Sequence, residues 1–120
     1  LTIEQISVSW THGDLQMANI LVNDDQVKVI DWESSAKRYF LYDLFVLLGK
    51  VRTENSLGTS ITEFMKKSQS LVVKVTKQEV LLCLIEELRF YVSEDFSENF
   101  YFCGKTNNEL CSQILEYINE

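Results

Sequence analysis

The chain of 120 residues has room for one domain, and its 46% hydrophobic and 24% charged residues are the balance of a folded globular protein, not of a disordered tail. No apolar run reaches the roughly 20 residues that a membrane-spanning helix needs. The net charge of −7 arises in residues 79–120, where nine acidic residues face two basic ones, and such an acidic balance argues against a nucleic-acid partner.

Short strands and one hairpin are predicted between residues 8 and 33. Val8-Ser9-Trp10 forms a brief apolar strand, and two β-branched runs follow at Ile20-Leu21-Val22 and Val27-Lys28-Val29-Ile30. The stretch 23–26 separates these two runs, and its Asn and Asp residues supply turn chemistry. The pattern predicts an antiparallel hairpin with a four-residue turn.

In residues 40–120 the apolar residues recur with a helical period, which predicts four or five helices. Capping residues are expected at Thr59 or Ser60, at Thr76 together with Glu79, and at Thr106 or Asn107. The apolar faces predict a core made of Leu44, Leu47, Leu48, Phe64, Leu81, Leu84, Leu88, Ile114 and Leu115. Residues 71–75 fit a helix end, a linker or a short strand. The expected fold class is α+β, mostly helical, with a small β-hairpin.

The three cysteines indicate a reducing compartment. Cys83, Cys103 and Cys111 are odd in number, lie in apolar helical patterns and form no Cys-x-x-Cys pair. We therefore expect buried free thiols and neither zinc nor disulfides, which fits a cytoplasmic protein. No basic segment followed by an apolar segment opens the chain, so nothing argues for secretion.

Three oxygen-bearing side chains are predicted to converge at the open end of the hairpin. Antiparallel register places Asn19, at the start of the first strand, across from residue 30 or 31, so that Asn19 and Asp31 meet. Asp14 lies on the loop that leads into the same end. Such a set suits a hard divalent cation that takes its other ligands from water and phosphates. An Asp five residues before an Asn, followed by a strand ending in Asp, is the layout of phosphoryl transfer by kinases.

The motifs carrying these residues resemble the signature of the aminoglycoside phosphotransferase and choline kinase-like family. They are His12-Gly13-Asp14-Leu15, Asn19-Ile20-Leu21-Val22, Ile30-Asp31-Trp32-Glu33 and Tyr42-Asp43-Leu44. The resemblance covers about residues 8–48, and it implies a small-molecule kinase with a protein-kinase-like fold that uses ATP and Mg²⁺. It implies that Asp14 is the catalytic base, that Asn19 and Asp31 bind Mg²⁺ and hence the nucleotide, and that His12 and Asp43 are structural supports of the catalytic loop.

Departures from protein kinases favour a small-molecule acceptor. Position 13 is Gly where protein kinases have Arg, and Trp32-Glu33 replaces Phe-Gly after the metal-binding Asp. Only eleven residues separate Asp31 from Asp43, too few for an activation segment of the protein-kinase type. We expect Trp32 to lie in the core, and Glu33 to be an exposed carboxylate unless it reaches the metal or the substrate.

The nucleotide-clamping lobe is expected to be a missing partner of this chain. The glycines of the 120-residue chain form no Gly-rich loop that could cover phosphates; they are Gly13, Gly49, Gly58 and Gly104. We therefore interpret residues 1–120 as a partial domain, the C-terminal lobe of a longer kinase. Residues 8–33 would form the catalytic loop and metal-binding hairpin, and residues 40–120 the helical subdomain. Alone, the chain should be catalytically silent.

The acceptor is expected to be a small molecule with a hydroxyl group. The acidic residues of the C-terminal part would suit an amine-bearing aminoglycoside or choline-like alcohol; they include Glu86, Glu87, Glu94, Asp95 and Glu98. A sugar or another neutral alcohol stays open, because these acids can all face solvent. Two alternative functions also stay open: a degenerate kinase-like binding or scaffolding module without turnover, and a metal-dependent hydrolase that uses Asp14 and Asp31.

Overall fold

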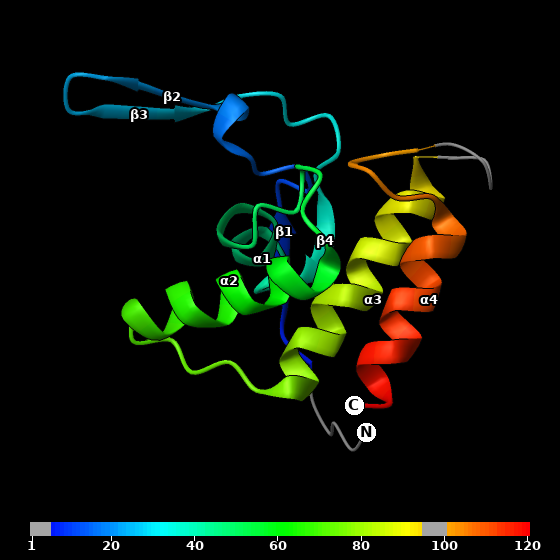
Figure 1. The fold of residues 1–120 in the computed structure, drawn as a ribbon. Helices are drawn as coiled ribbons and strands as arrows, with labels where there is room; N and C mark the ends of the chain where they lie inside the picture. Colours follow the sequence, from blue (N-terminus) through cyan, green and yellow to red (C-terminus); the bar gives the residue numbers. More distant parts are fainter. Residues whose placement is uncertain (1–5, 95–100) are drawn as a thin grey trace.

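Antiparallel strand pairs and four helices make up the part of the chain that the computed structural model describes, residues 6–94 and 101–120 (Figure 1). The elements are β1 (Val8–Thr11), a 3-10 turn (Met17–Asn19), β2 (Ile20–Asn23), β3 (Gln26–Val29), β4 (Ala36–Tyr39), α1 (Tyr42–Leu48), α2 (Leu57–Ser70), α3 (Lys77–Ser93) and α4 (Asn107–Ile118). Strand β1 pairs with β4, and β2 pairs with β3. The fold is α+β and mostly helical, as the sequence predicts.

Strands β2 and β3 form the predicted hairpin, which projects away from the helices (Figure 1). Its turn is shorter than predicted: Asn23 pairs with Gln26, so that Asp24 and Asp25 alone form the loop. Asp24 has a φ of 54°, in the left-handed region that two-residue hairpin turns require and that Asp tolerates. The strands therefore each extend one residue further toward the tip than the β-branched runs indicate.

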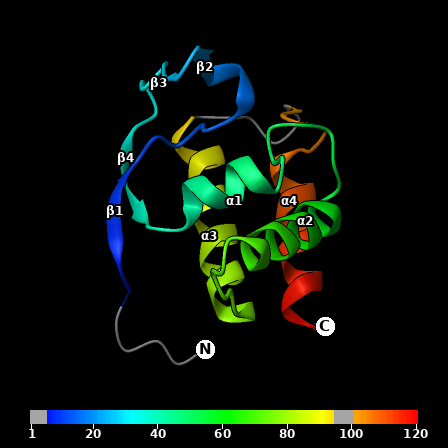
Figure 2. The ribbon, with the colours of Figure 1, turned by 90° about the vertical axis from the view of Figure 1, so that its left-hand side faces the viewer.

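Strand β4 was not predicted, yet it holds the site together. Val8 pairs with Tyr39 and Thr11 with Ala36, so β1 and β4 run side by side (Figure 2). Charged residues at 37 and 38 interrupt the apolar alternation of this strand, which hid it in the sequence. Because the pairing brings the two ends of residues 12–35 together, the whole segment with the predicted site is held by this two-stranded sheet.

Helices α2, α3 and α4 begin at side-chain caps, whereas α1 follows Leu41 without one. Thr76 and Glu79 form a complete capping box at α3, and the Thr106 hydroxyl accepts the N–H of Glu109 at α4, as predicted. The cap of α2 is Ser56, which accepts the N–H of Thr59, so this helix begins earlier than the predicted caps at 59 and 60. Residues 71–76 link α2 to α3 without forming a strand.

The core lies between the four helices and takes in part of the predicted apolar set. Phe64, Leu84 and Ile114 are buried, while Leu44, Leu48, Leu81 and Leu88 are partly buried against the core. The prediction for Leu115 is wrong: Leu110 and Ile114 occupy the inward face of α4 and leave Leu115 58% exposed. The buried face of α1 also differs from the predicted one. Its buried residues are Tyr42, Phe45 and Val46, and Leu47 is only partly buried.

All three cysteines are free, but only Cys83 is buried; Cys103 and Cys111 are half-buried. Burial, and then the nearby carboxylates of Glu79 and Glu86, raise the pKa of the Cys83 thiol well above its usual value, so this thiol stays protonated. Among the described helices, none combines the length and apolarity needed to cross a membrane.

Two leucine-to-alanine variants test where the core lies. Leu84→Ala should lower the free energy of unfolding by about 2–5 kcal/mol, because it leaves a cavity in a fully buried position. Leu115→Ala removes the same atoms from an exposed position and should cost less than about 1 kcal/mol. Urea denaturation followed by circular dichroism measures both values, and equal losses would contradict this assignment of the α4 face.

Candidate active site

The loop between β1 and the hairpin is anchored to the start of α1 by one carboxylate. The two oxygens of Asp43 accept the backbone N–H groups of His12 and Gly13, at 2.7 and 3.0 Å. Gly13 has a φ of 91°, and a Cβ there would lie 2.5 Å from the Arg38 guanidinium and 2.6 Å from the Ser34 carbonyl oxygen. Glycine is therefore required at this position, both for its backbone conformation and for the space.

His12 connects the same loop to the end of the hairpin. The buried imidazole accepts the N–H of Asp14 at its Nδ1, at 3.1 Å, which leaves the proton on Nε2. Nε2 lies 2.8 Å from the carbonyl oxygen of Ile30 and donates to it. His12 thus bridges the backbone at Asp14 and the backbone next to Asp31.

Asn19 lies at the junction of the loop and the hairpin. Its amide Nδ2 donates to the carbonyl oxygen of Asp14, at 2.9 Å. The N–H of Ile30 donates to the carbonyl oxygen of Asn19, at 2.9 Å, so residue 19 lies opposite residue 30, one of the two predicted positions. Asp31 follows as the next residue, exposed and with a φ of 63°. The backbone therefore brings the three predicted residues to one end of the hairpin.

Arg52 is a part of the site that the motifs did not reveal. Its Nε forms an ion pair with the Asp14 Oδ1 at 2.8 Å, and one terminal nitrogen pairs with the Glu87 carboxylate at 2.7 Å. Its other terminal nitrogen donates to the carbonyl oxygen of Gly13 and to the hydroxyl of Tyr42, each at 3.1 Å. The buried guanidinium therefore joins the loop that carries Asp14 to α1 and α3.

The chain matches a known protein family. The model described as "Phosphotransferase enzyme family" matches residues 5–65, half of the chain, including all four motifs. The chain belongs to this family. The match confirms the resemblance and indicates a phosphotransferase, kinase-like function. No significant match was found among the curated proteins or the solved structures.

The carboxylates of α3 in this phosphotransferase have partners within the chain. Glu86 accepts the N–H of Tyr39 at 2.9 Å and pairs with Arg89 at 3.2 Å. Glu87 is buried against Arg52. Glu94, the residue after α3, is exposed and accepts the Ser34 hydroxyl. These contacts reduce the open negative charge that the sequence predicted here. The other two acids of that prediction, Asp95 and Glu98, lie outside the described residues.

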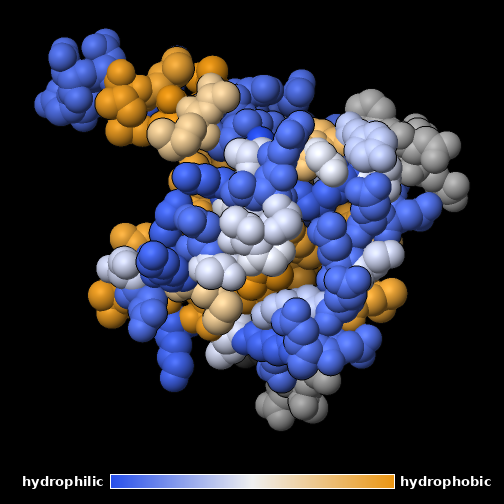
Figure 3. All heavy atoms as spheres, viewed as in Figure 1, coloured by the Kyte–Doolittle hydropathy of each residue, from blue (hydrophilic) through white to orange (hydrophobic). Residues whose placement is uncertain are grey.

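Trp32 is not in the core, in contrast to the prediction. The residue is 52% exposed; its Nε1–H donates to the Val29 carbonyl oxygen at 2.9 Å, and its ring packs edge-to-face with His12. The reason is that the hairpin points away from the helices, so its flank lies in solvent. Hydrophobic side chains also line the hairpin behind its hydrophilic tip (Figure 3); the exposed ones are Leu21, Val22 and Val27.

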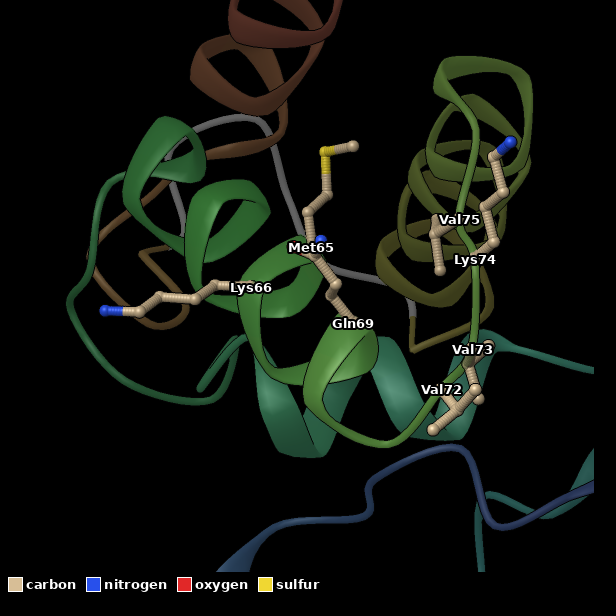
Figure 4. A pocket seen from close by; sticks show the side chains of 7 residues that line it. All are labelled: Met65, Lys66, Gln69, Val72, Val73, Lys74 and Val75. Carbon is tan, nitrogen blue, oxygen red and sulfur yellow. The ribbon is translucent and has the colours of Figure 1, made fainter.

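The candidate site reaches the surface of the molecule, where the Asp14 side chain is 24% exposed and Asp31 is exposed. A hollow of about 510 Å³ lies elsewhere, between Met65 to Gln69 of α2 and residues 72–75 of the linker to α3 (Figure 4). None of the predicted site residues lines it. Among residues 6–94 and 101–120, no group of three His, Cys, Asp or Glu side chains gathers to hold a metal ion, so any cation at this site would need Asn19 or ligands from a bound molecule.

A sequence signal for the Arg52 network did exist. Val80, Cys83, Leu84 and Tyr91 form the buried stripe of α3, and Glu87 occupies a position of the same stripe. A charged residue there needs a buried partner of opposite charge. The sequence could therefore have predicted a buried basic partner, although it did not identify that partner as Arg52.

A pair of glycine variants tests the conformation of the loop. Gly13→Ala should lower the free energy of unfolding by about 1–3 kcal/mol, because its Cβ would contact the Ser34 backbone at a positive φ. Gly58→Ala is the control: it lies in the first turn of α2 with nothing near its Cβ, and should stabilise by up to about 1 kcal/mol. Thermal unfolding compares the two, and a neutral Gly13→Ala would contradict the described loop.

Proposed function

We propose that this chain forms the catalytic part of a kinase that transfers the γ-phosphoryl group of ATP to a hydroxyl group of a small molecule. One observation carries the proposal: the stretch matched by the phosphotransferase family brings Asp14, Asn19 and Asp31 to one end of a hairpin, with Asn19 bonded to the backbone of Asp14. In phosphoryl transfer the protein chiefly positions groups and stabilises charge, so oxygen-bearing side chains at fixed positions are what the reaction needs.

Asp14 is the proposed catalytic base. Its carboxylate would orient the acceptor hydroxyl and accept the proton that this hydroxyl loses. The side chain is 24% exposed, so an acceptor can reach it from solvent. His12 and Asp43 would support this step by fixing the backbone on which Asp14 lies, through the contacts of the imidazole with Asp14 and Ile30 and of the carboxylate with the loop.

Asn19 and Asp31 are the proposed Mg²⁺ ligands. Because Nδ2 of Asn19 donates to Asp14, the amide oxygen of Asn19 is the atom left for a cation. Asp31, next to the residue that pairs with Asn19, is exposed and would supply the negative charge. Two hard oxygen donors fit Mg²⁺, which keeps several waters and takes further ligands from phosphates. When bound, Mg²⁺ would neutralise charge on the phosphates of ATP.

A nucleotide-clamping N-terminal lobe is the proposed partner of this chain. In support, Val8 and Trp10 of β1 expose apolar side chains, and the hairpin does the same at Leu21, Val22 and Val27. Exposed apolar surface of this extent commonly marks an interface.

The proposed acceptor is an alcohol, either a cationic aminoglycoside or choline-like molecule or a neutral sugar. The internal contacts of Glu86 and Glu87 weaken the electrostatic case for a cation, so the neutral class deserves equal testing. A screen of cationic, neutral and anionic acceptors against the full-length protein distinguishes them. Preference for anionic acceptors would exclude both proposed classes.

Asp14→Asn should lower kcat by about 10²–10⁴-fold with little change in nucleotide affinity, because it removes the proton acceptor and keeps the shape of the side chain. Steady-state kinetics of the full-length protein measures this. Near-normal turnover of Asp14→Asn would show that Asp14 is not the base.

Asp31→Ala should abolish Mg²⁺-dependent nucleotide binding. The control is Asp24→Ala, which removes the same charge at the tip of the same hairpin and should leave binding unchanged. Isothermal titration calorimetry of the full-length protein with ATP, with and without Mg²⁺, separates the two variants. Equal affinities for Asp31→Ala and Asp24→Ala would contradict the metal assignment.

The 120-residue chain alone should bind Mg²⁺-ATP only weakly and should not turn it over, because two ligands and a few waters hold the metal poorly without clamped phosphates. Calorimetry of this chain with Mg²⁺-ATP measures the affinity. Tight binding would contradict the proposal that a separate lobe clamps the nucleotide.

A further inference from the structure

We infer that Arg52 is a positioning residue for the catalytic base: it holds one carboxylate oxygen of Asp14 so that the other oxygen receives the acceptor hydroxyl. The inference rests on the proposed role of Asp14 in phosphoryl transfer. Nothing in the motifs or in the family match assigns a role to Arg52, which lies in the segment between α1 and α2.

Two donors converge on the same oxygen of Asp14. Arg52 Nε lies 2.8 Å from Oδ1, and the side-chain amide of Gln16 donates to the same atom at 3.1 Å. Within the described residues, no hydrogen bond occupies Oδ2. The carboxylate plane is therefore fixed from one side, and Oδ2 is the atom free to accept a proton from a substrate.

The guanidinium is itself held rigidly. Its side chain is 2% exposed, and Glu87, Gly13 and Tyr42 bind the nitrogens that do not contact Asp14. Its central carbon lies 4.2 Å from the centre of the Phe90 ring. A planar fork with five N–H donors can make all these contacts in one orientation, which a lysine cannot do. A side chain held in this way can keep a reacting group within the narrow range of positions that catalysis needs.

The charges in this cluster indicate more than a structural ion pair. Burial alone would lower the pKa of Arg52, but the Glu87 carboxylate and the Tyr42 hydroxyl raise it well above its usual value, so Arg52 stays charged. Glu87 already neutralises it. Buried ions are costly to desolvate, and Glu87 alone would satisfy the need for a counter-charge. The further bonds to Asp14 and to the Gly13 carbonyl oxygen connect this charge to the catalytic loop.

In a reaction limited by proton abstraction, the basicity of the catalytic group would decide the rate. Phosphoryl transfer differs, because its transition state is loose and the acceptor oxygen forms little bond to phosphorus before the phosphoryl group leaves. Orientation of the acceptor hydroxyl therefore matters more than basicity. A displacement of about 1 Å in a reacting group can cost about 10²-fold in rate.

The test is a double-mutant cycle with Arg52→Gln and Asp14→Asn in the full-length protein. Arg52→Gln alone should lower kcat by about 10–10²-fold while KM for Mg²⁺-ATP changes less than about twofold. In the Asp14→Asn background the same change should have almost no effect, because the carboxylate that Arg52 positions is gone. Arg52→Lys should recover only part of the rate, since it restores the charge without the fork.

Arg38→Gln is the matched control. Arg38 is also a buried arginine, but it donates to the Thr11 hydroxyl and the Ser34 carbonyl oxygen and has no contact with Asp14. Any loss that it causes should persist in the Asp14→Asn background. If Arg52→Gln does not fold, Arg52→Met combined with Glu87→Met removes both buried charges together, a change that proteins often tolerate, and enters the cycle in its place.

The outcomes separate the two claims. Near-normal turnover in Asp14→Asn would overturn the proposed function. Loss of turnover in Asp14→Asn with unchanged kcat in the Arg52 variant would overturn only the positioning role. A loss caused by the Arg52 variant that is equally large with and without Asp14 would assign Arg52 to the stability of the fold, and would also overturn the positioning role.

Discussion

The placement of the candidate site depends on the carboxylate of Asp43, which accepts two adjacent backbone N–H groups of the loop that carries Asp14. Hydrogen bonds to a charged group are worth about 1.5–3 kcal/mol each, more than neutral ones. Because Asp43 lies in the first turn of α1, the loop takes its position directly from the helical core. The positive φ at Gly13 follows from this arrangement, since the N–H groups of His12 and Gly13 must both face one side chain.

A second connection reaches the same loop from the opposite direction. Asp43 holds the backbone ahead of Asp14, whereas Arg52 holds the Asp14 side chain and takes its own position from Glu87 on α3. Asp43 belongs to α1, whereas Arg52 lies between α1 and α2 and is bound to Glu87 of α3, so a shift of the loop would break contacts to both helices. Rigidity here arises from tertiary contacts, because residues 12–16 have no regular secondary structure.

The sequence predicted what depends on local chemistry. Strand periodicity placed Asn19 opposite residue 30, because this feature depends on neighbours along the chain. The roles of Asp14, Asn19 and Asp31 stay predictions from motif spacing. The sequence did not predict β4, whose charged residues mask its period, or Arg52, whose site partners lie 35 to 39 residues away. Such contacts depend on how the helices pack. The face of α1 was misjudged for the same reason, since Tyr42 is drawn inward by its hydroxyl contact with Glu87.

The pairing of β1 with β4 also lets the hairpin and the helical core differ in stability. Residues 12–35 begin after Thr11 and end before Ala36, and these two residues are paired. The segment is therefore closed at its base by the four residue pairs of β1 and β4. Most of the hairpin's side chains lie outside the helical core. Segments with few buried contacts open at lower free energy than the domain around them. The hairpin can thus exchange with open forms, or tolerate changes in its turn, while the anchored loop before it and the helices beneath stay folded.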